Sequence, residues 1–235
     1  MAGSTLAMAA ALLVAAGTFA ACSESTTPTA RSEPPASRTP SPSASVTAPP
    51  DRTAPAAAKP PFSVSDGRPR RASLSIPALG LTDLAVVPYR GRTDDARGTV
   101  IQDGGVAASP HGPQGGVGPG GLGNYQVTAH RTSSTRAFEM LPSLRIGQRV
   151  TVTAGGVRYV YEIRRTRETS FRSARSLAEQ RAAVPGRPGL APTRAFITLS
   201  TCATREDHAE GNFWSDEFKN PEHRIDKIGV LVQSR

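Results

Sequence analysis

The stretch that decides how this chain folds reads Phe196-Ile197-Thr198-Leu199-Ser200-Thr201-Cys202. Its side chains alternate between apolar and polar types with a period of two, which is typical of a β-strand that buries one face. Ile197 and Leu199 fall on the apolar face, and Cys202 ends the polar face. A cysteine in this position suits a nucleophile held on a rigid strand. It equally suits a small buried hydrophobe, as most lone cysteines are, and this stretch alone leaves both interpretations open.

A second stretch, Asn124-Tyr125-Gln126-Val127-Thr128-Ala129-His130-Arg131, shows the same alternation. Val127 and Ala129 point to one side, and His130 ends the polar side of its strand as Cys202 ends its own. A nucleophilic thiol needs a partner that takes its proton or stabilises its thiolate, and histidine is the usual one. Two such strands lying side by side would bring these ends together. We therefore favour the nucleophile.

Three motifs, in this order along the chain, resemble those of the sortase family. Val127 to Arg131, with the apolar series after it, resembles the sortase histidine segment, its short helix and its Leu-x-x-Gly-x-x-Val strand; that series is Phe138, Leu141, Leu144, Gly147 and Val150. Thr198 to Cys202 resembles the Thr-Leu-x-Thr-Cys signature, and Arg224 to Val232 resembles the last sortase strand. The resemblance runs roughly from Arg71 to Val232 and is nearest to the class E type of high-GC Gram-positive bacteria.

The pattern of many short strands predicts a mainly-β domain over residues 71–235. The sortase resemblance implies the same fold class, a closed β-barrel of about eight strands with two short helices and long loops. Strands are expected over residues 72–76, 84–87, 124–131, 149–154, 157–166, 196–202 and 225–232, and short helices over 136–144 and 177–184. Residues 91–123 are rich in glycine, so most of them are expected to form a long surface loop.

The resemblance also implies a cysteine transpeptidase whose catalytic residues are His130, Cys202 and Arg224. Cys202 would attack the Thr–Gly carbonyl of a C-terminal sorting signal and form a thioester. His130 would protonate the departing amine and later deprotonate the incoming one, while Arg224 would face the oxyanion. The signal would be of the Leu-Ala-x-Thr-Gly or Leu-Pro-x-Thr-Gly type, and the class E likeness favours the first. The implied partners are surface proteins with this signal and an amine of a cell-wall precursor; no cofactor and no metal are implied.

The arginine assignment has a rival in Arg205, three residues after the cysteine. Arg224 begins a clear terminal strand, whereas Arg205 falls in a loop, where a solvated side chain is the ordinary outcome. We therefore expect Arg224 to be the oxyanion residue.

Other functions could use the same nucleophile. With water as the acceptor the chain would be a secreted cysteine peptidase, and the sequence does not decide between water and an amine. A non-catalytic surface-binding lipoprotein on the same barrel would have no need of the histidine, cysteine and arginine together. The L,D-transpeptidases carry a Ser-His-Gly-Cys motif, whereas Ser200-Thr201-Cys202 lacks its histidine and glycine.

Composition argues against several further classes. The formal charge of +9 suggests nucleic-acid binding, but the arginines are scattered and no aromatic-interleaved basic cluster stands out. A basic exterior suits work near an anionic envelope at least as well. A metal site made of Cys202, Asp207, His208 and His223 matches no zinc spacing. The chain has only two cysteines, Cys22 and Cys202, so no structural disulfide is expected.

Residues 1–22 resemble a signal peptide, because their apolar run is short for a membrane span. Phe19-Ala20-Ala21-Cys22 resembles a bacterial lipobox in which Cys22 becomes lipidated. Phe19 stands where a leucine-like residue is usual, and no Lys or Arg precedes the run, so an uncleaved signal anchor is the alternative. Residues 23–70 are dominated by Pro, Ala, Ser and Thr, which predicts a disordered tether. We expect the domain to be anchored by its N-terminus at the extracytoplasmic face of the cell membrane.

Overall fold

A computed structural model describes residues 63–235 of the chain. The expected signal peptide and lipobox, and the tether up to residue 62, lie outside the described residues. The last part of the expected tether is described, and it is hydrogen-bonded to the domain: Ser65 N donates to Gly120 O at 2.9 Å, and Gly118 N donates to Gly67 O at 2.7 Å. Ser65 and Gly67, which fall within the expected tether, therefore contact the domain that was expected to begin at Arg71.

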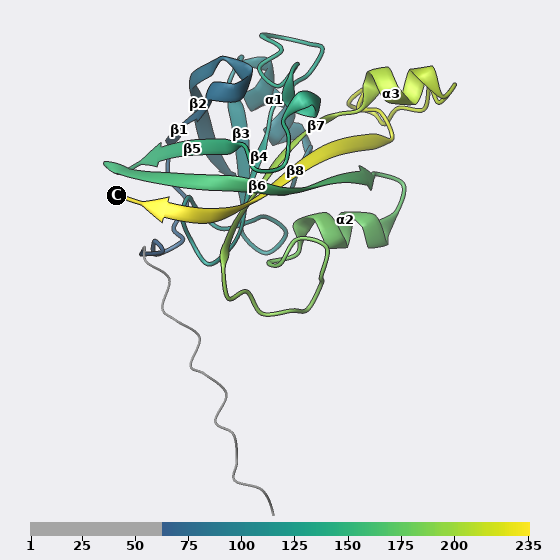
Figure 1. Ribbon diagram of the computed structural model, residues 1–235. Coiled ribbons are helices and arrows are strands. Elements are labelled where there is room, and N and C mark those ends of the chain that lie inside the picture. Colours follow the sequence, from purple (N-terminus) through teal and green to yellow (C-terminus); the bar gives the residue numbers. More distant parts are fainter. Residues whose placement is uncertain (1–62) are drawn as a thin grey trace, which may run out of the picture. The chain divides into compact units, whose positions relative to one another are not determined.

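Eight strands close into a barrel in the order β1-β2-β3-β4-β7-β8-β6-β5 (Figure 1). Their bounds are β1 Ala72–Ile76, β2 Leu81–Arg90, β3 Ala107–His111, β4 Gly123–Thr128, β5 Arg149–Ala154, β6 Val157–Ser170, β7 Ala195–Cys202 and β8 His223–Ser234. The mainly-β barrel of about eight strands that the sequence predicted is confirmed. Closure leaves no free sheet edge in the barrel, so each strand finds a hydrogen-bonding neighbour on both sides.

The described residues contain three α-helices, where the sequence predicted two short helices. They are α1 Ala96–Asp103, α2 Ala174–Arg181 and α3 Thr204–Ala209, accompanied by two short 3₁₀ turns, η1 Pro77–Leu79 and η2 Leu141–Ser143. Helix α2 matches the helix expected near residue 177, and the helix expected over 136–144 is only the 3₁₀ turn η2. Among the described residues, none of the helices has the length and apolarity needed to cross a membrane.

The expectation that most of residues 91–123 form one long loop was wrong in part: the glycine-rich residues 112–122 lie outside helices and strands, but α1 and β3 interrupt the stretch before them. Strand β3 runs parallel to β2, and a parallel pair needs a crossover connection, which α1 supplies. Helix α1 buries only Gly98 and Gln102, so it has no apolar stripe that a sequence pattern could reveal. Its start is fixed instead by Asp95, whose side chain accepts a hydrogen bond from Gly98 N as an N-cap.

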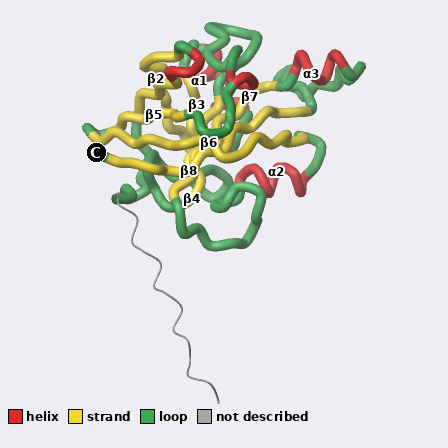
Figure 2. The backbone as a smooth tube through the Cα atoms, in the orientation of Figure 1, coloured by secondary structure: helices red, strands yellow, loops and turns green. Residues whose placement is uncertain are grey.

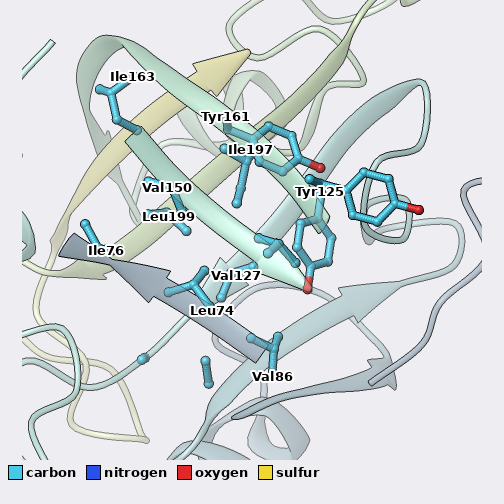
Figure 3. Packing of buried hydrophobic residues seen from close by; sticks show 14 of the residues in the cluster. Leu74, Ile76, Val86, Tyr125, Val127, Val150, Tyr161, Ile163, Ile197 and Leu199 are labelled. Atoms are coloured by element: carbon cyan, nitrogen blue, oxygen red, sulfur yellow. The ribbon is translucent and has the colours of Figure 1, made fainter. Parts of the chain in front are cut away.

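The barrel interior is filled by apolar side chains from every strand (Figure 3). The cluster includes Leu74, Ile76, Val86, Ala107, Tyr125, Val127, Val150, Val152, Tyr161, Ile163, Ile197, Leu199 and Leu231. Ile197 and Leu199 of β7 are both fully buried, as their alternation predicted. The opposite face of β7 therefore points out of the barrel core, and it carries Cys202.

Candidate active site

The three predicted catalytic residues lie at the same end of three neighbouring strands. Cys202 of β7 is paired directly with Arg224 of β8 in the antiparallel register. Strand β4 runs parallel to β7 with Thr128 opposite Ser200, so His130, two residues further on, comes level with Cys202. Adjacent strands are about 4.8 Å apart, so the three backbones lie side by side in the order histidine, cysteine, arginine.

Two hydrogen bonds hold the ends of β4 and β7 together beyond the last registered pair. Ala129 N donates to Ser200 O at 3.4 Å. The hydroxyl of Thr201 donates to Ala129 O at 2.8 Å. These bonds flank His130 and Cys202 in the chain, so both residues are attached to a rigid part of the barrel. The side-by-side arrangement that the sequence left open is therefore present in the structure.

The Cys202 side chain is a free thiol on a partly exposed residue at the last position of β7. Burial raises the pKa of this thiol above its ordinary value, because a thiolate loses hydration inside the protein. The positive charges of Arg224 and Arg131 oppose this effect on the Cys202 pKa, whereas the negative charges of Asp94 and Asp216 add to it. Cys202 therefore rests as the thiol near neutral pH and needs a proton acceptor to become nucleophilic.

Arg224 is almost completely buried, with 1% of its surface exposed. Its Nε donates to Asp94 Oδ2 at 3.0 Å, and its Nη1 donates to Pro221 O at 3.0 Å. The guanidinium carbon lies 4.1 Å from the centre of the Phe171 ring, which packs on its flat face. The remaining nitrogen, Nη2, has no hydrogen-bond partner among the described residues. The guanidinium is therefore held on several sides and keeps one donor for a further acceptor.

The charge state of Arg224 is secure despite its burial. Burial lowers the pKa of this arginine, but the opposing effects, with the negative charge of Asp94 the largest, outweigh it, so the net shift of the Arg224 pKa is upward. A buried, permanently positive group with one unused donor, on the strand next to a nucleophile, has the properties that an oxyanion requires.

His130 follows β4 directly and is paired with a carboxylate. Its Nε2 lies 2.9 Å from Asp103 Oδ1, at the last residue of α1. A carboxylate only accepts, so this contact places a proton on Nε2 and leaves Nδ1 as the ring nitrogen that can exchange one. The main-chain oxygen of His130 accepts from Phe138 N at 3.0 Å, which fixes the loop after the histidine.

The rival arginine, Arg205, lies in a different setting. It is exposed on α3, and its Nη2 donates to Glu139 Oε1 at 2.8 Å. Surface ion pairs of this kind contribute little to stability and turn the side chain away from other partners. The structure thus brings Arg224, and not Arg205, into register with Cys202.

Arg131, which the sequence analysis did not predict to be a site residue, contacts the end of β7. Arg131 donates from Nη1 to Cys202 O at 3.2 Å, and its guanidinium makes a two-pronged ion pair with Glu206 of α3. Helix α3 follows the end of β7 almost at once (Figure 2). Arg131 therefore ties the main chain at the nucleophile to the helix that succeeds it.

The segment over residues 93–103, before and within α1, also reaches the site, and no sequence pattern indicated this. Asp94 contacts Arg224 from one end of the segment, and Asp103 contacts His130 from the other. In sequence these pairs are 130 and 27 residues apart. No periodicity or short motif links residues so distant, so only the folded chain reveals them.

A model of the sortase domain matches residues 74–213, which is more than half of the chain. The chain belongs to the sortase family. The matched segment contains His130 and Cys202 and ends before Arg224, so the assignment of the arginine rests on the geometry of β8.

Two solved sortases share this fold at low sequence identity. SrtA sortase from Actinomyces oris aligns with a TM-score of 0.53 and 17% identity, covering 74% of this chain and 86% of its own. Sortase E from Streptomyces avermitilis aligns with a TM-score of 0.51 and 22% identity, covering 72% of this chain and 91% of its own. No curated protein sequence matches this chain.

This sortase is therefore an enzyme of the cysteine transpeptidase type. Sortases act on proteins that carry a sorting signal and pass them to amine acceptors. Within residues 63–235, no three His, Cys, Asp or Glu side chains are grouped so that they could hold a metal ion. The catalytic roles of His130, Cys202 and Arg224 stay predictions.

Proposed function

We propose that this sortase cleaves a C-terminal sorting signal between Thr and Gly and transfers the protein to an amine of a cell-wall precursor. The observation that carries the proposal is the cross-strand pair of Cys202 and Arg224, with His130 on the strand at the other side of the cysteine. A nucleophile flanked by a proton-transfer group and a fixed cation is the minimum set for acyl transfer through a tetrahedral intermediate.

The first half of the reaction would form the acyl-enzyme. As the Cys202 thiol gives its proton to Nδ1 of His130, its sulfur attacks the threonine carbonyl carbon, and the carbonyl oxygen takes up the negative charge. Arg224 stabilises that charge through its unused Nη2 donor. The C–N bond then breaks, His130 gives a proton to the departing glycine amine, and a thioester remains on Cys202.

The second half would resolve the thioester. An incoming amine loses a proton to His130 and attacks the thioester carbonyl, which regenerates the thiol and leaves a new amide bond. Water in the same position would give hydrolysis instead. The fate of the acyl group thus depends on which of the two reaches the carbonyl first.

The class E likeness favours Leu-Ala-x-Thr-Gly over Leu-Pro-x-Thr-Gly as the signal, and we propose the first as the preferred substrate. We also propose that the enzyme works at the extracytoplasmic face of the membrane, anchored at its N-terminus. The apolar run before Cys22 and the Pro- and Ala-rich stretch over residues 23–62 support this placement.

The test is to incubate the full chain, kept in solution with a mild detergent, with each of the two signal peptides, with and without an amine. Triglycine and a peptide containing diaminopimelate serve as acceptors. The proposal predicts cleavage after threonine and a product whose mass equals the acyl fragment joined to the amine. Cleavage with only the hydrolysed product, at every amine concentration, would show a peptidase, and the absence of cleavage would overturn the proposed substrate class.

A further inference from the structure

One short segment, residues 93–103 and called the α1 segment below, contacts both His130 and Arg224, the two residues that flank Cys202. Asp94 and Asp103 lie at the two ends of the α1 region, and each carboxylate contacts a different residue of the site. The Asp94 contact with Arg224 is buried on both sides, with 7% and 1% of the side-chain surfaces exposed. The Asp103 contact with His130 lies at the rim, because 61% of the Asp103 side chain is exposed and 14% of His130.

The α1 segment is anchored, so neither carboxylate is free to drift. At its start, the Thr93 hydroxyl donates to Gln180 Oε1 at 3.0 Å, and Asp94 is held at a φ of +55°, a conformation that non-glycine residues seldom adopt. At its end, the Ser134 hydroxyl donates to Asp103 O at 3.0 Å. The two sides of α1 are thus tied to helix α2 and to the loop that follows His130.

The exposed position of Asp103 separates a functional role from a structural one. An ion pair or hydrogen bond at the surface contributes little to folding, because water competes for both partners. Its effect on a ring that must present one nitrogen to a thiol and a substrate can still be large, since acid–base catalysis depends on geometry first. Of the two carboxylates, Asp103 is far more exposed than Asp94, and its contact reaches His130, a residue of the proposed catalytic machinery.

We propose that Asp103 is a positioning residue that fixes the His130 ring by accepting a hydrogen bond from Nε2, so that Nδ1 exchanges the proton with Cys202 and the substrate amine. The proposal rests on the proposed function, because it assigns His130 the proton transfer of that reaction. The segment over residues 93–103, which contains α1, thereby holds His130 through Asp103 and Arg224 through Asp94.

The kinetic test compares Asp103→Ala and Asp103→Asn with the matched control Glu139→Gln, which alters an exposed carboxylate paired with Arg205. Asp103→Ala is expected to lower kcat by about 10- to 100-fold, a part of the 10²–10⁴-fold typical of acid–base catalysis, with KM within about twofold. Asp103→Asn keeps an acceptor oxygen and should recover part of the loss. Glu139→Gln should match the wild type. All variants should unfold at the same temperature as the wild type within about 2 °C, as exposed contacts imply.

A second readout does not depend on turnover. A ring N–H that donates to a carboxylate gives a low-field proton resonance, and that of His130 is assigned in the free enzyme by its loss in His130→Gln. His223, whose Nδ1 lies 2.6 Å from Asp207 Oδ1, gives a separate resonance that should persist in every variant. The His130 resonance should vanish in Asp103→Ala and persist in Glu139→Gln. Wild-type kcat in Asp103→Ala, or survival of the His130 resonance in it, would overturn the positioning role. If the wild type itself leaves both signal peptides uncut, the proposed function fails, and the resonance alone then decides whether Asp103 holds the ring.

Discussion

The Cys202 thiol lies among groups that act on its charge in opposite directions. Burial raises its pKa, and of the neighbouring charges Arg224 lowers this pKa most while Asp94 raises it. The same Asp94 holds Arg224 in place through Nε. Asp94 thus raises the pKa of the Cys202 thiol and also holds the guanidinium of Arg224, the proposed oxyanion donor, in place. The net effect favours the thiol form of Cys202.

The rate of Cys202 alkylation by iodoacetamide, followed by the mass of the peptide that contains it, should report this balance. Because burial disfavours the thiolate, the rate should rise with pH at a midpoint above the ordinary value of about 8.5. Asp94→Asn removes a negative charge and should move the midpoint down, whereas Arg224→Gln removes a positive charge and should move it up. A midpoint at or below the ordinary value, or shifts of the same sign in the two variants, would contradict this picture.

The role of Arg224 can be separated from that of Arg205 by a pair of alanine variants. Arg224→Ala should lower kcat/KM by at least ~100-fold, the scale of losing one oxyanion donor. Arg224→Lys should recover little of it, because lysine keeps the charge but loses the planar fork. Arg205→Ala should cost little, since its partner Glu139 is at the surface. An inactive Arg205→Ala beside an active, folded Arg224→Ala would exchange the two roles.

At the scale of elements, α2 is held to the barrel by buried polar contacts. Gln180 of α2 donates from Nε2 to Asp226 Oδ1 at 3.0 Å and to Ser200 Oγ at 3.3 Å. The side-chain amide of Asn124 donates from Nδ2 to Gln180 O at 2.9 Å, and that of Gln126 donates from Nε2 to Arg181 O at 3.4 Å. These amides satisfy carbonyls at the end of α2 that have no partner within the helix. The polar face of β7 predicted from the sequence is therefore covered by a helix and not open to water.

Replacing Gln180 with leucine should therefore destabilise the whole domain. The change leaves the Asp226 carboxyl, which is fully buried, without one of its donors. A buried acceptor left unpaired costs about 1–3 kcal/mol, so the free energy of unfolding in urea should fall by that amount. The exposed Arg175, which pairs with Glu179 on the same helix, provides the control, because Arg175→Ala should cost less than about 1 kcal/mol. Equal losses in the two variants would contradict the burial argument.

The elements that the sequence predicted are those whose side chains alternate or repeat. Strands β4 and β7 could be read from their pattern because one face of each is fully apolar. Helix α1 and strand β3 could not, since α1 buries only Gly98 and Gln102 and β3 is a five-residue strand that contains a proline. The nucleophile and histidine were therefore predictable from local pattern together with the family motifs, whereas Asp94 and Asp103 enter the site through an element without a pattern.

At the scale of the whole molecule, the ends of neighbouring barrel strands carry the proposed catalytic residues, and the connection between β2 and β3 carries the two carboxylates that contact them. Strands β6 and β7 both lead directly into helices, α2 and α3, and β8 begins at the end where Cys202 lies (Figure 1). The row of His130, Cys202 and Arg224 is thus built at one rim of a closed sheet. If these residues are catalytic as proposed, a substrate peptide is expected to bind at that rim.

Attachment to the membrane is a prediction for the whole chain. If Phe19-Ala20-Ala21-Cys22 is a working lipobox, the mature protein should begin at a diacylglyceryl-modified Cys22. Intact-mass analysis of protein extracted from membranes of a Gram-positive host measures this directly, and Cys22→Ala should abolish the modification. An unmodified N-terminus upstream of Leu6 would instead indicate an uncleaved signal anchor.

The central claim is that Cys202 carries the acyl group between two partners. The most direct measurement is intact-mass analysis of the full chain mixed with a Leu-Ala-x-Thr-Gly peptide in the absence of an amine, followed by proteolysis to locate the adduct. The account predicts a mass increase equal to the peptide fragment up to threonine, on Cys202 alone, which disappears when an amine is added and never forms in a folded Cys202→Ala variant. An adduct at another residue, or peptide cleavage by Cys202→Ala at the wild-type rate, would contradict it.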